Sequence, residues 1–184
     1  LAHELEVGRD YELVCTTLGG LCRYRIGDVV KVVGFHGTAP LVEFGYRRGQ
    51  LLNVRGEKTS EAQFADALRA SFPAGGGGPL EYTCTEVTEQ HPPRYSVLVE
   101  LPGGGAGLPP DTDARLDAAL CAANPVYCAW RDKGAIGKCE VHRVHPGAFE
   151  ELRRRRICEG ASPQQLKISR VDRDKSHLAL LRRH

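Results

Sequence analysis

The first 55 residues alternate short apolar runs with Gly and Pro. Several runs are rich in β-branched residues, which favour a pleated, half-buried surface. The runs cover residues 11–16, 21–26, 28–35, 40–46 and 50–54. Because Gly and Pro mark the turns between them, this region is predicted to form consecutive short strands in an antiparallel meander or a small barrel.

The pattern then changes. Ser60 followed by Gln63 is typical of a capping box, and apolar residues recur at helical spacing from Phe64 to Phe72. These features predict the first helix of the chain, over residues 60–72.

Strand and helix patterns alternate through the remainder. Strands are predicted at 80–90, 94–101 and 139–145. Tyr95, Val97 and Val99 share one face of the second of these strands. One helix is predicted to end before Pro125, because proline disfavours helix in the preceding residue, and a basic helix stops at Gly160. The alternation indicates a mixed α/β (α+β) fold that contains an α/β sandwich.

Composition narrows the class of protein. The chain has 184 residues, of which 41% are hydrophobic, and a net charge of +2, too small to demand an acidic partner. No apolar run is long enough to span a membrane, and no signal-peptide pattern opens the chain. Seven scattered cysteines, an odd number, favour reduced thiols and a cytoplasmic location. The chain begins with Leu1 and contains no Met, so we expect it to be a fragment.

A glycine run at 75–78 could be mistaken for a phosphate-binding loop. Such a loop needs a preceding strand and a following helix whose free N–H groups face the anion. Here a predicted helix precedes the run and a predicted strand follows it. The run is therefore predicted to be a linker, as is the segment 103–110.

Two further clusters are assigned neither a metal nor a nucleic acid. Cys139, His142 and His145 are spaced by three residues, but residues three apart on a strand face opposite sides, so no metal site is predicted. The basic run 153–156 has no interleaved aromatic residues for base stacking. It is predicted to be a solvated helix face.

The Gly27-Asp28 pair lies at the corner between two predicted strands. Glycine lets the backbone bend and lets a ligand approach, and a carboxylate can accept two hydrogen bonds from a vicinal diol such as a ribose. Asp28 is therefore a candidate nucleotide ligand. Taken alone, such a pair is most often an ordinary turn.

Several motifs occur together and in order. They include residues 11–17, 24–30, 32–36, 57–61, 124–127, 147–149 and 160–167. In this order they resemble the auxin-responsive acyl acid amido synthetases, the Gretchen-Hagen family, which is a branch of the adenylate-forming superfamily. The resemblance spans nearly the whole chain, with gaps at 73–79 and 102–111.

The resemblance implies a domain organisation and a reaction. Residues 1–55 would be the C-terminal strands of the large adenylating domain, 56–60 a hinge and 61–184 a small α/β lid domain. The family uses Mg-ATP to activate a small carboxylic acid as an acyl-adenylate, and the amine of an amino acid then attacks it. The upstream portion of the same chain would carry the phosphate loop and most of the acyl pocket, so the fragment alone should be inactive.

The resemblance also implies roles for particular residues. Asp28 would hold the ribose hydroxyls, and Lys58 would hold a phosphate of ATP or of the acyl-adenylate. Lysine is a compact cation suited to a polyphosphate, and its effect grows as charge develops on pyrophosphate. The alternative for Lys58 is a solvated lysine near a helix start.

Weaker candidates precede Asp28 in the sequence. Tyr24 or Arg25 would line the nucleotide site, although core packing and a surface pair explain them equally well. The turn containing Thr17 and Gly20 would lie near the acyl group by the same resemblance.

One segment departs from the family pattern. Plant members carry Tyr-Lys followed by Pro-Arg-Cys, whereas residues 166–171 of this chain read Leu-Lys-Ile-Ser-Arg-Val. The change leaves the fold plausible and puts the catalytic contribution of this region in doubt. A second hypothesis is thus an inactive member, resembling animal relatives of the family, that binds a nucleotide or a protein partner without ligating. Neither the acid nor the amino acid can be read from the sequence.

Overall fold

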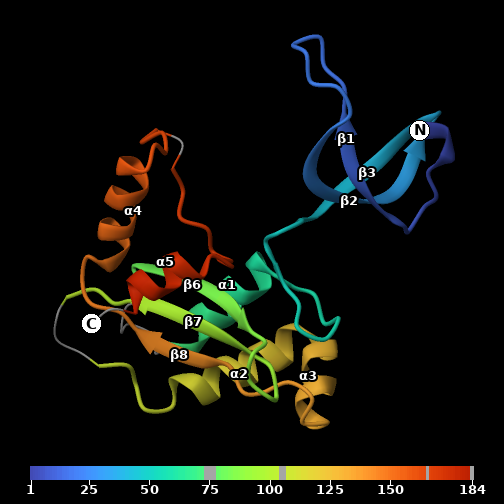
Figure 1. The fold of residues 1–184 in the computed structure, drawn as a ribbon. Helices are drawn as coiled ribbons and strands as arrows, with labels where there is room; N and C mark the ends of the chain where they lie inside the picture. Colours follow the sequence, from blue (N-terminus) through green and yellow to red (C-terminus); the bar gives the residue numbers. More distant parts are fainter. Residues whose placement is uncertain (73–77, 104–106, 165, 183–184) are drawn as a thin grey trace. The chain divides into compact units, whose positions relative to one another are not determined.

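The computed structural model describes residues 1–72, 78–103, 107–164 and 166–182 (Figure 1). Most of the predicted glycine linker at 75–78, and part of the one at 103–110, lies outside the described residues. The chain divides into two compact units, Leu1–Leu51 and Leu52–His184.

The first unit is a three-stranded antiparallel sheet. A short 3-10 helix at Ala2–Glu4 precedes strands β1 (Asp10–Cys15), β2 (Tyr24–His36) and β3 (Ala39–Arg47), which pair in chain order. The predicted meander is confirmed. Its buried apolar residues are Val29, Val30 and Val32.

The prediction of two separate strands at 21–26 and 28–35 is wrong. The chain passes through the corner at Gly27 as one strand, β2. The bend falls at an irregularity in the pairing with β1, which joins Glu12 to Val29 and then Val14 to Arg25, so that residues 26–28 are skipped. The pairing with β3 begins at Asp28.

Strand β4 (Leu51–Leu52) spans the boundary of the two units and pairs with β5 (Thr59–Ser60), which is followed by helix α1 (Glu61–Ser71). The predicted capping box is present: the Ser60 hydroxyl accepts the Gln63 N–H at 3.2 Å, and the Gln63 side chain accepts the Ser60 N–H at 2.9 Å. Two orphan donors at the start of α1 are thereby satisfied, which explains why the helix begins there. The strand expected over 50–54 is limited to β4.

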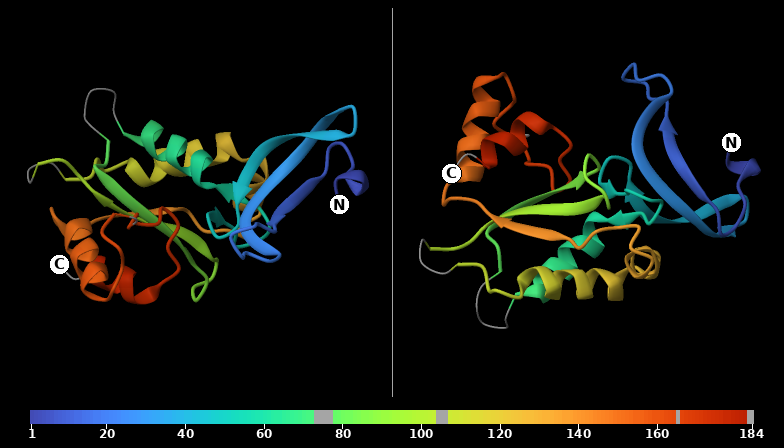
Figure 2. Two further views of the ribbon diagram at one scale, coloured as in Figure 1. Left: turned by 90° about the horizontal axis from the view of Figure 1, so that it is seen from above. Right: turned by 60° about the horizontal axis from the view of Figure 1, so that its bottom comes forward.

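A sheet between two helical layers forms the body of this unit. Strands β6 (Glu81–Val87) and β7 (Arg94–Glu100) are antiparallel, and β8 (Glu140–Arg143) runs parallel to β7. Helices α1 and α2 (Thr112–Ala123) cover one face, and α4 (Ala148–Cys158) and α5 (Lys175–Leu181) cover the other (Figures 1 and 2). The predicted α/β sandwich is confirmed.

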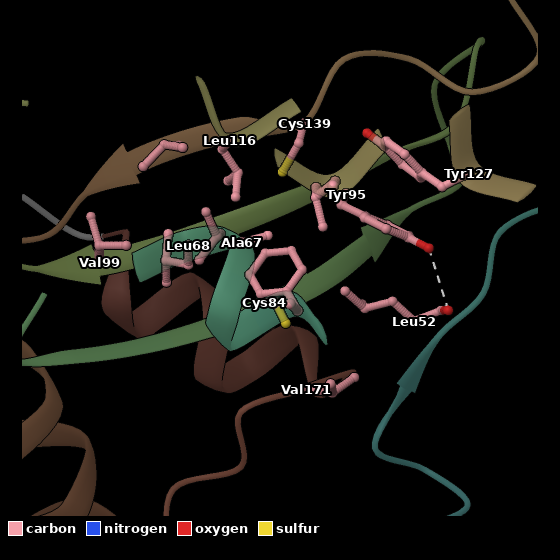
Figure 3. Packing of buried hydrophobic residues seen from close by; sticks show 14 of the residues in the cluster. Leu52, Ala67, Leu68, Cys84, Tyr95, Val99, Leu116, Tyr127, Cys139 and Val171 are labelled. Atoms are coloured by element: carbon pink, nitrogen blue, oxygen red, sulfur yellow. Dashed lines mark hydrogen bonds between the residues drawn. The ribbon is translucent and has the colours of Figure 1, made fainter. Parts of the chain in front are cut away.

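Strand β7 divides the core of the second unit in two. As predicted, Tyr95, Val97 and Val99 share one face, and they pack in a cluster with residues of α1 and α2. Figure 3 shows Tyr95 and Val99 in this cluster. Leu98 points to the other face and packs with Phe149 and other residues of α4 and α5. The period-two alternation along one strand thus supplies both cores.

Two short helices had no predicted counterpart, α3 (Pro125–Asp132) and α5. Pro125 ends α2, as predicted, but it is also the first residue of α3, where its missing N–H costs nothing. The side chain of Asn124 caps α3 by accepting the N–H groups of Val126 and Tyr127. None of the helices among the described residues is long and apolar enough to cross a bilayer.

Candidate functional site

The Gly27-Asp28 corner depends on glycine. Gly27 has φ +88°, a conformation that other residues adopt at a cost, and its carbonyl accepts the N–H of Arg48 at 2.7 Å. The main chain turns here without losing its pairing with β3. The side chain of Asp28 follows this turn directly and is 18% exposed.

Asp28 is held by an arginine that the sequence analysis did not single out. Arg47 donates from Nε and Nη2 to the two carboxylate oxygens of Asp28, at 2.6 and 3.0 Å. These hydrogen bonds lower the pKa of Asp28 below its usual range. Asp28 and Arg47 face each other across β2 and β3, equally far along their strands from the His36–Ala39 pair, so the hairpin register could have revealed the contact.

A second acidic residue organises the neighbouring arginines. Glu12 accepts hydrogen bonds from Arg25 and, at 2.8 Å, from Arg48. The hydrogen bond from Arg25 is the largest cause that lowers the pKa of Glu12. Arg25 is thus engaged by an acid on β1, whereas the neighbouring Tyr24 is about half exposed. Both flanking candidates are exposed, Arg25 with 62% of its side chain and Tyr24 at 49%.

The predicted turn between β1 and β2 is present. The Thr17 N–H donates to the carbonyl of Leu21 at 2.8 Å, and the Gly20 N–H donates to the carbonyl of Thr17 at 3.2 Å. Gly20 has φ +98°. Both candidates, Thr17 and Gly20, are exposed on this turn.

Lys58 lies in the second unit, in the segment between β4 and β5. Its side chain is exposed, whereas its neighbours Glu57 and Thr59 are 3% and 0% exposed. Lys58 has φ +46°, in the left-handed region that disfavours L-residues with a Cβ. It precedes the helix cap Ser60 by two positions and so lies outside α1.

A buried polar network surrounds the lysine's neighbours. It joins Glu57 and Thr59 to Tyr95 of β7 and to Asn124 before α3. These residues are far apart in sequence, so no local pattern predicted the network.

The segment that departs from the family pattern has a structural role. Ile168 and Val171 are buried, and the carbonyl of Arg170 accepts the N–H of Cys84 on β6 at 2.8 Å. The guanidinium of Arg170 lies 4.7 Å from the ring centre of Tyr82. Lys167 is exposed. This segment therefore completes the edge of the sheet next to β6.

The side chains of the Cys139–His145 segment do not form a metal site among the described residues. Cys139 is buried and burial raises the pKa of its thiol, whereas His142 on β8 is exposed. The basic run 153–156 lies in α4, where its arginines form ion pairs with acids such as Glu150 and Glu159. Arg154 and Arg155 are exposed, as predicted for a solvated helix face, whereas Arg153 and Arg156 are half-buried.

Comparisons with known proteins cover most of the chain. The family model described as "GH3 family central domain" matches residues 1–47, and the one described as "GH3 family C-terminal domain" matches residues 62–176. The rice (Oryza sativa subsp. indica) protein named indole-3-acetic acid-amido synthetase GH3.8 is 42% identical over 175 residues, which are 90% of this chain and 29% of the rice protein.

Two further relatives extend the comparison. The human (Homo sapiens) GH3 domain-containing protein is 38% identical over 185 residues, covering 97% of this chain and 34% of that protein. The solved structure of GH3.15 acyl acid amido synthetase superposes with a TM-score of 0.75 and 28% identity, over 98% of this chain and 34% of that one. The chain thus spans roughly a third of the length of these relatives.

Proposed function

This chain belongs to the GH3 family, and from that premise we propose that it is the C-terminal part of an ATP-dependent acyl acid–amino acid ligase. The observation that carries the proposal is the superposition of 98% of the chain on an acyl acid amido synthetase. The alignment with that enzyme includes residues of both units. Relatives in this family are named as amido synthetases.

The proposed reaction has two steps. A carboxylate oxygen of the acid attacks the α-phosphorus of ATP and releases pyrophosphate, which gives an acyl-adenylate. The amine of an amino acid then attacks the acyl carbon and expels AMP, which leaves an amide. The protein's contribution is to position the phosphates, to stabilise developing charge and to exclude water.

We propose that Asp28 accepts hydrogen bonds from the ribose hydroxyls. The contact with Arg47 uses one lone pair of each carboxylate oxygen, so each oxygen keeps acceptor capacity for a diol. Arg47 also fixes the carboxylate plane in place. In the same proposal Tyr24 or Arg25 borders the nucleotide, and the turn with Thr17 and Gly20 borders the acyl group.

We propose that Lys58 binds a phosphate of ATP or of the acyl-adenylate. Its side chain is exposed, whereas those of Glu57 and Thr59 are buried. A compact ammonium group suits a polyphosphate. Its charge would stabilise the transition state most when pyrophosphate departs, so Lys58 is the residue of this chain that we expect to act in catalysis.

Magnesium would enter with the nucleotide. Among the described residues there is no cluster of three or more His, Cys, Asp and Glu side chains that could hold a metal ion. This part of the chain does not fit a protein cage for Mg²⁺, which is commonly held by substrate phosphates and a few carboxylates. No step is assigned to a metal bound by this chain.

The domain assignment is part of the same proposal. Residues 1–55 would belong to the large adenylating domain, 56–60 would be the hinge and 61–184 would be the lid. The contact units divide between Leu51 and Leu52, and Glu57 and Thr59 are hydrogen-bonded within the second unit. In this proposal residues 57–59 therefore move with the lid, and the rotation falls on the residues before them. The free thiols of all seven cysteines fit the cytoplasmic location that the sequence predicts.

The second candidate is a family member that has lost ligation and serves as a nucleotide-binding or protein-interaction scaffold. Its support is the structural use of residues 166–171, where Ile168 and Val171 are buried and Arg170 pairs with the sheet edge. Residues of this segment that are buried in the core are not available to contact a substrate.

The test is pyrophosphate release by the full-length protein. Purified protein is incubated with Mg-ATP and a panel of small carboxylic acids, with indole-3-acetic acid as the first probe because the rice relative is named for it. The proposal expects acid-dependent pyrophosphate release, followed by amide formation when amino acids are added. Nucleotide binding without acid-dependent release of pyrophosphate would instead support the scaffold.

A further inference from the structure

A buried acid immediately precedes the candidate lysine. Glu57 is 3% exposed, and its carboxylate accepts the main-chain N–H groups of Val54 and Arg55, each at 2.7 Å. The hydroxyl of Tyr95 donates a third hydrogen bond. We propose that Glu57 is a positioning residue for Lys58, one that fixes the segment between β4 and β5 so that the lysine is held outward for an anionic ligand. The inference rests on the proposed phosphate-binding role of that lysine and deepens it.

The groups around the carboxylate match its ionised form. In the three hydrogen bonds described above, the partner of the carboxylate is the donor: two main-chain N–H groups and the hydroxyl of Tyr95. An ionised carboxylate can only accept hydrogen bonds, so these partners suit it. Burial, and then the hydrogen bond to Glu57, raises the pKa of Tyr95, so this hydroxyl keeps its proton. The buried ring of Tyr95 stacks on Tyr127, with centroids 5.3 Å apart, which fixes the direction of the hydroxyl (Figure 3). Tyr95 is therefore a rigid donor aimed at Glu57.

A second anchor holds both residues that flank Lys58. The amide Nδ2 of Asn124 donates to the carbonyl of Glu57 at 2.8 Å and to Oγ1 of Thr59 at 3.0 Å. The other end of Asn124 caps α3 by accepting the N–H of Val126 at 3.1 Å. The main chain on each side of the lysine is thus tied to the folded core of the second unit.

The lysine itself carries the strain of this arrangement. With φ +46°, Lys58 occupies a region where glycine or asparagine costs less. Strained backbone persists where its surroundings over-determine it, and such positions are associated with ligand sites. Lysine does not make this backbone conformation easier to adopt. We therefore infer that the residue is a lysine because of its side chain.

A fixed main chain has a defined consequence for binding. Ordering a loop costs conformational entropy that would otherwise reduce the affinity for the ligand. Because Glu57 and Asn124 order this segment beforehand, only the side chain of Lys58 remains to be ordered when a phosphate binds. Loosening the segment should weaken the binding of a nucleotide that has phosphates and leave its nucleoside unaffected.

The test is a double-mutant cycle on the full-length protein, with ATP and adenosine as probes in calorimetry. Glu57→Gln places an amide donor against N–H and O–H donors, and Tyr95→Phe removes one donor while keeping the ring. Each is measured alone and together with Lys58→Ala. Thr83→Val is the matched control, because it removes another hydrogen bond of the same unit, from Thr83 Oγ1 to the carbonyl of Ser169.

The inference expects Glu57→Gln and Tyr95→Phe each to weaken ATP binding, by about tenfold for the former, and to leave adenosine binding unchanged. In the Lys58→Ala background neither should cause a further loss, and Thr83→Val should affect neither probe. Thermal unfolding of each variant checks that it is folded, and Tyr95→Phe carries the test if Glu57→Gln is not.

Three results would overturn the inference. Losses that add to that of Lys58→Ala would show that Glu57 acts independently of the lysine, and an equal loss of adenosine binding would show general damage to the site. In both cases the phosphate role of Lys58 would stand. If Lys58→Ala alone left ATP binding intact, the proposed role of the lysine would fall together with the inference.

Discussion

The two units hold their candidate residues by different physical means. In the first unit, Asp28 is fixed by an arginine side chain that is itself half exposed, 49%, on a sheet whose buried apolar residues are three valines. In the second unit, the neighbours of Lys58 are fixed by hydrogen bonds within a buried core. Exposed ion pairs are screened and contribute little stability, whereas buried hydrogen-bonded groups are costly to disturb.

The difference extends to the apolar residues. The first unit exposes large apolar side chains on its strands; among them are Val14, Leu41, Val42 and Phe44, each about half exposed or more. The second unit buries apolar residues on both faces of its sheet. The second unit therefore has the interior of an independent domain, and the first has the composition of a sheet that is completed by other protein. In the proposed function, the upstream portion of the same chain would complete this sheet.

The strongest test of this contrast separates the units. Residues 52–184, which contain both core clusters, are expected to unfold in a single cooperative thermal transition. Residues 1–51 bury too few apolar side chains to offset their conformational entropy and are expected to show no transition. Circular dichroism against temperature measures both. A cooperative transition in residues 1–51 alone would contradict the contrast.

Matched phenylalanine substitutions probe the two interiors. Phe149 is 1% exposed and packs against Leu98 and α5, so Phe149→Ala should lower the free energy of unfolding by about 3–5 kcal/mol. Phe44 is 66% exposed, so Phe44→Ala in this chain should change it by less than about 0.5 kcal/mol. Urea unfolding measures both. Equal losses would mean that the first unit is packed as well as the second.

Glycine at position 58 should relieve the strain that the buried network imposes. Lys58→Gly is expected to be more stable than Lys58→Ala by about 0.5–1 kcal/mol, because relief of the left-handed strain exceeds the entropy cost of glycine. The control is the same pair of substitutions at Lys31 in strand β2, where glycine should be the less stable. Chemical denaturation compares the four variants, and a less stable Lys58→Gly would argue against a strained lysine.

The smallest effect concerns the exposed pair in the first unit. Because Arg47 lowers the pKa of Asp28, the pair stabilises the folded state above the usual aspartate range, and this contribution is lost as the pH falls through the lowered pKa. In Arg47→Ala the pKa of Asp28 should rise towards its usual value. Carboxyl ¹³C NMR titration measures the shift, and Arg9→Ala, which removes an ion pair with Glu6, serves as the control. An unchanged midpoint would show that Arg47 does not hold Asp28.

Local patterns in the sequence predicted the elements that depend on neighbours in the chain. The alternation of Tyr95, Val97 and Val99 gave the inner face of β7, and Ser60 with Gln63 gave the start of α1. They did not predict the strand that continues through Gly27, because its continuity depends on pairing with β1 on one side of the bend and with both β1 and β3 on the other. Helix α5 carries too short a pattern to detect.

The candidate site shows the same limit. Asp28 and Lys58 were selected from motifs, but the groups that hold them come from distant segments. Arg47 reaches Asp28 across a hairpin, and Asn124 reaches the carbonyl of Glu57 from the start of another helix. Such contacts depend on tertiary structure, so residue types and spacing alone could not reveal them.

The measurement that tests the central claim most directly is ATP and adenosine binding by the full-length protein, in calorimetry, for wild type, Asp28→Ala and Lys58→Ala. A hydrogen bond to a charged group is worth about 1.5–3 kcal/mol, so Asp28→Ala should weaken both ligands by about ten- to a hundredfold. Lys58→Ala should weaken ATP alone by a similar factor. Asp10→Ala and Lys138→Ala, at exposed positions, should change neither. A wild-type protein that binds neither ATP nor adenosine at millimolar concentration would contradict the account.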